Sequence, residues 1–306
     1  MSRKLQLLFL CALILLFIGP VSSIAGNELP VSSPFFRPYE GDFSIEMVVG
    51  YKAQSSRLTI PALDSARETM SKEASTGIAL NYGVTEYFSI GVSGKFMADQ
   101  DYSLIQSGPA FAGNPGSNSR NRGFYDAGFQ LGLRMLGTRT DEWFVNLDMG
   151  FLPGLTDANN FLFSWPHNQY LAGITLGRNI EAWSFGILSA MQYYAPSALD
   201  KSDEKNNQLL SNSQLFVQVD FASLYLRTSA GVVKFLDSRS NENALKKKIF
   251  PTGQVEMGFP FTDTCVLSAR LSYVAGAQGE LTVAGFNAFL VAQPIWMGSV
   301  SVVVAF

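Results

Sequence analysis

Apolar and polar residues alternate with a period of two through most of this chain, and that alternation limits how it can fold. Between residues 43 and 52 every second side chain is apolar: Phe43, Ile45, Met47, Val49 and Tyr51. Similar stretches occur at residues 88–93, 129–135, 143–151, 215–220 and 267–273. Successive side chains of a β-strand point to opposite faces, so the pattern predicts strands with one apolar and one polar face.

Period-two alternation also fits a soluble β-sandwich, and the lengths of the connections favour a membrane barrel instead. Short connections are expected at residues 85–86, 137–141, 178–181, 222–223 and 260–264. Long and polar or irregular ones are expected at residues 54–73, 99–122, 153–167, 194–211 and 236–249. The two kinds alternate along the chain, as the short turns and long loops at the two rims of an outer-membrane barrel do.

Aromatic residues gather near the ends of the apolar faces, which is a second feature of such barrels. Those expected near the short-turn rim include Tyr82, Tyr87, Trp143, Trp183 and Tyr273, and those near the other rim include Tyr51, Phe96, Phe151, Tyr170 and Tyr193. Rings at these positions are typical of the two girdles at the membrane interfaces.

The C-terminus carries a third feature. Val300, Val302, Val304 and Phe306 alternate on one face up to the last residue. This ending resembles the terminal aromatic signal by which bacterial outer-membrane barrels are recognised, so we expect Phe306 to serve as an assembly signal for the outer-membrane assembly machinery.

The N-terminus predicts a secretory signal peptide over residues 1–25. Arg3 and Lys4 precede an apolar run from Leu5 to Ile18, and small residues mark a cleavage site after Ala25. The apolar run is too short for a spanning helix. The mature chain is therefore expected to reach the bacterial outer membrane.

The pattern predicts an all-β fold, an antiparallel transmembrane β-barrel of about 12 strands over residues 43–306. Barrels of this kind normally have an even number of strands with both ends in the periplasm. Residues 276–293 are therefore assigned to a sixth outer loop and residues 294–306 to the twelfth strand; a barrel of 14 strands is the alternative. The preceding residues 26–42, with three prolines, are expected to form a periplasmic segment or a plug inside the barrel.

One stretch resembles known families. The run from Tyr82-Gly83-Val84-Thr85-Glu86-Tyr87 through the alternating residues to Val92 is similar to outer-membrane barrel families of unknown function, including those associated with phenol-degradation gene clusters. Residues 63–64, 67–69 and 216–220 also look similar to a bacterial envelope family of unknown function. The resemblance implies a barrel with a loosely assigned transport role.

If the apolar faces contact lipid, the polar faces line the lumen. The charged inward positions expected to form a constriction are Lys95, Asp126, Arg134, Asp148, Asp220, Arg227, Glu256 and Arg270. Other inward positions include Glu46, Lys52, Asn146 and Gln218. Acids and bases are balanced, which argues against a strongly charge-selective pore, and these groups could equally pair across a narrow barrel. Inward glycines leave room for water or for a plug, which either residues 26–42 or the loop 99–122 could supply. For that loop, a mobile polar crest is the favoured alternative.

The function predicted from these features is an outer-membrane channel or passive transporter for small solutes or small hydrophobic molecules. An outer-membrane enzyme acting on lipids is one alternative, and it depends on His167, the one histidine and ordinary near-neutral base in the chain. Ser164 is close, but no nucleophile motif frames it. A closed barrel that binds partners through its loops is the second alternative. Expected partners are membrane lipids, lipopolysaccharide and an unknown small solute; no cofactor, metal or nucleic-acid motif appears.

Overall fold

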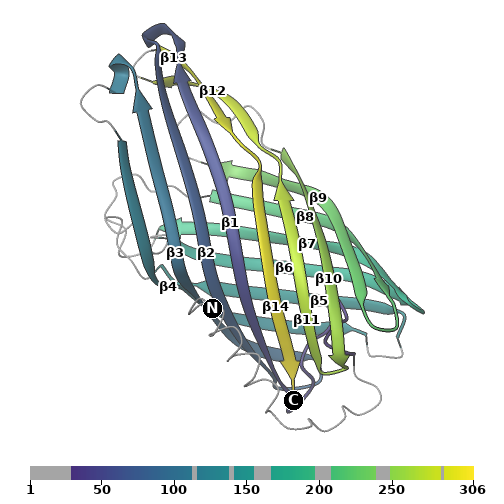
Figure 1. Cartoon of the computed structure of the whole chain (residues 1–306). Helices are drawn as coiled ribbons and strands as arrows, with labels where there is room; N and C mark the ends of the chain where they lie inside the picture. The colour runs from purple at the N-terminus through teal and green to yellow at the C-terminus, as the bar shows by residue number, and fades with distance from the viewer. Residues whose placement is uncertain are drawn as a thin grey trace.

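The computed structural model of the chain is an antiparallel β-barrel (Figure 1). It describes residues 29–111, 116–137, 141–154, 167–196, 208–238, 249–283 and 286–306, and the predicted signal peptide lies outside these residues. Helix among the described residues is limited to two short turns, Pro61–Leu63 and Pro109–Phe111, and no helix there is long and apolar enough to cross a membrane.

The described residues form fourteen strands. In chain order these are β1 Phe43–Ile60, β2 Ser65–Gly83, β3 Phe88–Ser107, β4 Gly116–Leu136, β5 Trp143–Leu152, β6 His167–Ile180, β7 Trp183–Pro196, β8 Gln208–Asp220, β9 Tyr225–Ser238, β10 Ile249–Thr262, β11 Cys265–Val274, β12 Ala277–Val283, β13 Phe286–Ala292 and β14 Ile295–Ala305.

Twelve of these strands close into a ring, which confirms the predicted strand number. Strands β1 to β11 pair with their neighbours in sequence, and β14 joins β11 to β1. At the junction, Phe43 and Phe306 exchange two backbone hydrogen bonds of 2.8 and 2.9 Å. A closed ring gives every strand two partners, which a sheet must have where no water can satisfy its edge.

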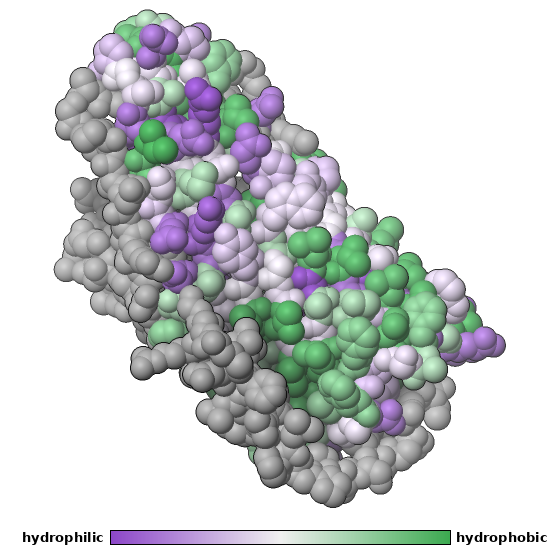
Figure 2. Space-filling view, in the orientation of Figure 1, coloured by the Kyte–Doolittle hydropathy of each residue, from purple (hydrophilic) through white to green (hydrophobic). Residues whose placement is uncertain are grey.

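The predicted alternation of inward and outward side chains is present along the ring. Apolar side chains such as Val49, Phe129 and Leu215 lie outside and are 43%, 60% and 64% exposed, whereas Gln218 and Asn146 lie inside and are nearly fully buried. Figure 2 shows the apolar residues gathered over the lower part of the visible face. This outer belt is the surface that contacts lipid.

The prediction of a long loop is wrong at two places. Residues 54–73 and 99–122 mostly continue the strands of two hairpins, so β1 to β4 span 18, 19, 20 and 21 residues. A tilted strand of about 9 to 11 residues already crosses a bilayer. The remainder projects beyond the ring, and these extended ends carry many of the hydrophilic residues visible in Figure 2. The described residues of 99–122 therefore mostly continue strands and do not fold back into the lumen.

The predicted sixth outer loop, residues 276–293, also contains strands. Strands β12 and β13 pair with each other, and β13 pairs with the far end of β1 through Ser56–Thr59. The hairpin thus adds to the projecting sheet and not to the ring (Figure 1). The alternative of a 14-stranded barrel is excluded, because these two strands lie outside the closed ring. Most of the other three predicted long loops lies outside the described residues.

Candidate functional site

The residues before β1 enter the barrel at its short-turn end. Phe35 is fully buried, and its ring stacks on that of Phe144 in β5 with centroids 4.5 Å apart. The ring of Phe216 in β8 lies 5.7 Å away. Gly177 in β6 provides the remaining space, because a Cβ atom there would overlap the ring of Phe35. Residues of three nearby strands on one side of the barrel, β5, β6 and β8, thus enclose one ring of this segment.

The segment spans the lumen, because a second apolar cluster holds it on the opposite wall. Val31 packs in a buried group with Tyr225 of β9, Val266 of β11 and Ala305 of β14, with Phe36 against it. We call residues 29–42 the inner segment. Its two clusters together resemble a small hydrophobic core built inside the barrel.

Polar side chains of the wall also bind the backbone of the inner segment. Asn146 donates a hydrogen bond of 3.0 Å to the carbonyl of Phe35. Gln218 and Arg227 each donate one of 3.1 Å to the carbonyl of Ser32. These contacts satisfy backbone carbonyls that would otherwise be buried without a partner.

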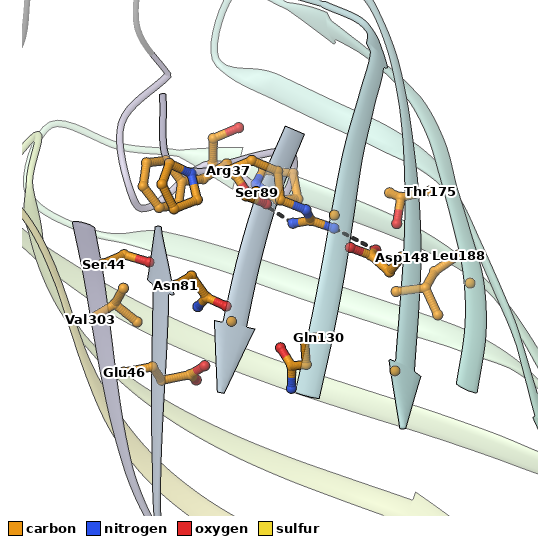
Figure 3. A pocket seen from close by; sticks show the side chains of 18 of the residues that line it. Arg37, Ser44, Glu46, Asn81, Ser89, Gln130, Asp148, Thr175, Leu188 and Val303 are labelled. Atoms are coloured by element: carbon orange, nitrogen blue, oxygen red, sulfur yellow. Dashed lines mark hydrogen bonds and ion pairs between the residues drawn. The ribbon is translucent and has the colours of Figure 1, made fainter. Parts of the chain in front are cut away.

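Two arginines fix the middle of the inner segment. Arg134 of β4 donates a 2.6 Å hydrogen bond to the carbonyl of Arg37 and lies over the ring of Tyr39, with its guanidinium carbon 3.8 Å from the ring centroid. Arg37 in turn donates to Asp148 of β5 over 2.5 Å, the interaction dashed in Figure 3. The segment then turns into β1 at Asp42, where burial raises the pKa of the carboxyl group.

A cavity of about 480 Å³ lies next to the inner segment in the lumen. Pro34, Phe36 and Arg37 contribute one side of it, and side chains from most strands of the ring contribute the rest. Figure 3 shows Glu46, Gln130 and Leu188 around this space from different strands. A second cavity of about 550 Å³, which shares Glu46 and Arg270 with the first, extends toward the long-strand side of the lumen.

The most buried ionic group of the lumen centres on Glu256 of β10. Its carboxylate accepts hydrogen bonds from Arg270 at 2.8 Å and from the hydroxyl of Tyr225 at 2.6 Å. Arg227 lies 3.5 Å from the same carboxylate and donates a 2.7 Å hydrogen bond to Gln218, which also holds the inner segment. The ionic group and the inner segment are therefore parts of one network.

A second ion pair lies further along the lumen. Lys95 of β3 donates to Glu73 of β2 over 2.8 Å, and both line the second cavity with Lys52. Asp220, at the end of β8, accepts a 2.7 Å hydrogen bond from Gln218.

Seven of the eight predicted constriction residues have described side chains, and all seven make interior contacts. Arg134, Asp148, Asp220, Arg227, Glu256 and Arg270 lie around the inner segment or the ionic group, and Lys95 lies apart from them in the second cavity. The side chain of Asp126 lies outside the description, as does that of His167, the first residue of β6.

Sequence reasoning did not single out Phe35, Arg37, Glu73 or Tyr225. Glu73 falls in a stretch that was assigned to a loop. Phe35 and Arg37 lie in a segment without periodicity, where the one signal was a pair of adjacent phenylalanines between prolines. Among the described residues, no group of three His, Cys, Asp or Glu side chains is placed to hold a metal ion.

Comparisons with known proteins give similarity of structure alone. No protein-family model and no curated protein matches the sequence. The crystal structure of the COG4313 outer membrane channel from Pseudomonas putida F1 has a TM-score of 0.61 and 11% identity, over 90% of this chain and 98% of that chain. The NanC porin gives a TM-score of 0.47 at 11% identity, over 84% of this chain and 98% of the porin. The P. putida toluene transporter TodX gives 0.46 at 12% identity, over 90% and 93%.

The fold is therefore that of bacterial outer-membrane barrels, as the sequence predicted. This similarity and the apolar outer belt support the predicted location in the outer membrane.

Proposed function

We propose that the chain is an outer-membrane channel for small solutes, whose inner end is closed by the inner segment. The observation that carries the proposal is the arrangement of cavity and segment. Two cavities that share Glu46 and Arg270 in their linings occupy the lumen, and the segment lies across its short-turn end. Solutes would enter from the long-strand side and leave when the segment moves.

The contacts of the inner segment are compatible with movement. It is held by two apolar clusters, one ion pair and hydrogen bonds to side chains, whereas its backbone pairing with the barrel strands is confined to the junction with β1 and the contact of Val31 with Asp263. Side-chain contacts of this kind can break without unpairing the ring. Of the predicted constriction residues, Arg134, Asp148 and Arg227 contact the segment directly, and in this proposal they help to retain it.

The test is the conductance of the mature chain in a planar bilayer, compared with a variant that lacks residues 29–38. The intact chain should show small or infrequent current steps, and the shortened chain larger and steadier ones. Equal conductance of two folded proteins would show that the inner segment does not close the lumen. Absence of current from both would remove the channel function.

A lipid-modifying enzyme is less well supported, since the neighbour with the TM-score of 0.61 is an outer membrane channel. Replacement of His167 by Ala, followed by a lipid hydrolysis assay of both proteins, tests that alternative. The recognition of Phe306 by the assembly machinery, contacts with lipopolysaccharide and the relation to families associated with phenol-degradation gene clusters stay predictions.

A further inference from the structure

We propose that the lumen binds small amphipathic anions, with the apolar part of the molecule against a wall of leucines and the anionic group near Arg270. This inference rests on the proposed channel, because it names the class of solute that the channel takes.

The leucine wall consists of Leu152 on β5, Leu171 on β6 and Leu188 on β7. Leu152 is directly paired with Gln169, and Leu188 with Gln214, so each shares the inward face with a polar neighbour. Leu171 and Leu188 line the first cavity, and Leu152 lines the second. Three adjacent strands thus present apolar side chains along the path through both cavities.

All three leucines are at least partly exposed. Leu188 is 40% exposed although it points inward, beside Thr175 in Figure 3. Glycines next to the leucines keep the wall shallow: a Cβ atom at Gly150 would lie 3.1 Å from the side chain of Leu171. Apolar area that faces water is stabilised when an apolar solute covers it.

The charged wall lies on the other side of the ring. In a closed ring of twelve strands the opposite wall is six strands away, so β5 faces β11, which carries Arg270, and β7 faces β1, which carries Glu46. For a round barrel, a strand spacing of about 4.8 Å and a tilt of about 40° give roughly 24 Å between opposite backbones. Once side chains fill part of this width, one small molecule can contact both walls.

The sign of the preferred head group follows from which partner of each ion pair faces the lumen. The side chain of Arg270 is 41% exposed, whereas that of Glu256 is 3% exposed. In the second cavity Lys95 is 38% exposed and Glu73 is 13% exposed. In both pairs the base is presented to the solute and the acid is covered.

Two acids limit this preference. Glu46 lines both cavities with Arg270, so the selectivity for anions is expected to be moderate. Asp148 is 44% exposed beside the inner segment, where it binds Arg37. An anionic group is therefore directed toward Arg270 and Lys95 and away from the inner segment.

The experiment is calorimetric titration of the full mature chain in phosphatidylcholine nanodiscs, with empty nanodiscs as the baseline. The probes are hexanoate, hexylamine with the same chain and the opposite charge, and acetate with the charge but no chain. Hexanoate should bind at least ten-fold more tightly than either of the others. Equal binding of hexanoate and hexylamine, or of hexanoate and acetate, would overturn the proposal.

Variants test separately whether Arg270 binds the anionic group and whether the leucine wall binds the apolar chain. Arg270→Gln and Leu188→Gln should each weaken hexanoate binding by about ten-fold, whereas Arg270→Lys and Leu188→Met, which keep the charge and the apolar surface, should retain most of it. Arg178→Gln is the matched control, because Arg178 pairs with Glu142 at the short-turn rim outside the cavities. Wild-type affinity in both Gln variants would also overturn the site.

Conductance of the same proteins in a planar bilayer separates this inference from the channel proposal. A protein that conducts without preferring hexanoate would refute the amphipathic site and leave the channel. A protein that binds hexanoate as described but never conducts would refute the channel and leave the site.

Discussion

The ring of Phe35 stacks in parallel on that of Phe144, with their centroids 4.5 Å apart and their planes 4° apart. Phe144 is part of the barrel wall, and Phe35 belongs to the segment that precedes the first strand. In the proposed channel this contact joins the wall to the piece of chain that would leave it, so the stability of the contact would set how readily the lumen opens.

Replacement of Phe35 by Ala should loosen the inner segment. Truncation of a buried phenylalanine costs about 3 to 5 kcal/mol, and much of that loss falls on the docked state of the segment because the ring of twelve strands is closed without it. Planar-bilayer recordings should show more frequent and longer openings. Phe289→Ala is the control, because Phe289 is 44% exposed on the projecting hairpin, and its replacement should leave the openings unchanged.

Replacement of Gly177, the cross-strand partner of Phe144, by Ala should displace the ring of Phe35. The added Cβ would overlap Phe35 and would lie 2.6 Å from the carbonyl oxygen of Phe185. Gly173→Ala is a matched control on the same strand, because its nearest contact would be an ordinary 3.7 Å. We expect more channel openings in the first variant and wild-type behaviour in the second.

A double-mutant cycle with Phe35→Ala separates the ring from the backbone contact of Gly177. If the clash with the ring dominates, Gly177→Ala should have a smaller effect on opening in the Phe35→Ala background than in the wild type. Additive effects would attribute the result to the contact with Phe185 instead.

How well a strand could be predicted from the sequence depended on what surrounds that strand. Within the membrane a strand has lipid on one side and the lumen on the other, so Phe43 to Lys52 alternates clearly and its faces were assigned correctly. Beyond the membrane both faces contact water, and residues 54–60 include Gln54, Ser56 and Arg57 without a clear apolar face. Alternation disappears there although the backbone pairing continues, and the sequence pattern therefore predicts loops where the strands extend.

The inner segment shows a different limit. From the prolines and the inward glycines, the sequence allows this segment to be either a periplasmic segment or a plug inside the barrel. Its partners, such as Asn146 for the carbonyl of Phe35, were not predictable, because contacts between residues 111 positions apart depend on the closed ring and not on local pattern.

Replacement of Glu256 by Gln should make the channel more selective for anions. The carboxylate is almost completely buried between Arg227 and Arg270, so its removal leaves two guanidinium groups without their shared counter-charge. In a gradient of potassium chloride the reversal potential should shift in the direction of chloride permeability. Loss of one partner of a buried ion pair also costs about 3 to 5 kcal/mol, which a lower urea midpoint should report.

The control for this substitution is Glu142→Gln. Glu142 pairs with Arg178 at the short-turn rim and is 62% exposed, and exposed pairs contribute about 0 to 1 kcal/mol. Neither the reversal potential nor the urea midpoint should change appreciably. A reversal potential that stays the same in Glu256→Gln would show that ions do not pass the Glu256 group.

Replacement of residues 276–293 by a short flexible linker should leave the barrel closed. The hairpin of β12 and β13 contacts the ring through the far end of β1, whereas closure depends on the ten residue pairs between β1 and β14 and the ten between β11 and β14. The shortened protein should therefore still migrate as a compact species in unheated electrophoresis and conduct as the intact chain does. If the shortened protein fails to fold, the hairpin takes part in closing the ring. The backbone N–H of Gln293 donates a 2.8 Å hydrogen bond to the carbonyl of Ser55, at the point where the partner of β1 changes from β14 to β13. A second variant that keeps residues 293 and 294 and removes the rest of the hairpin distinguishes that hydrogen bond from the strand pairing of β13.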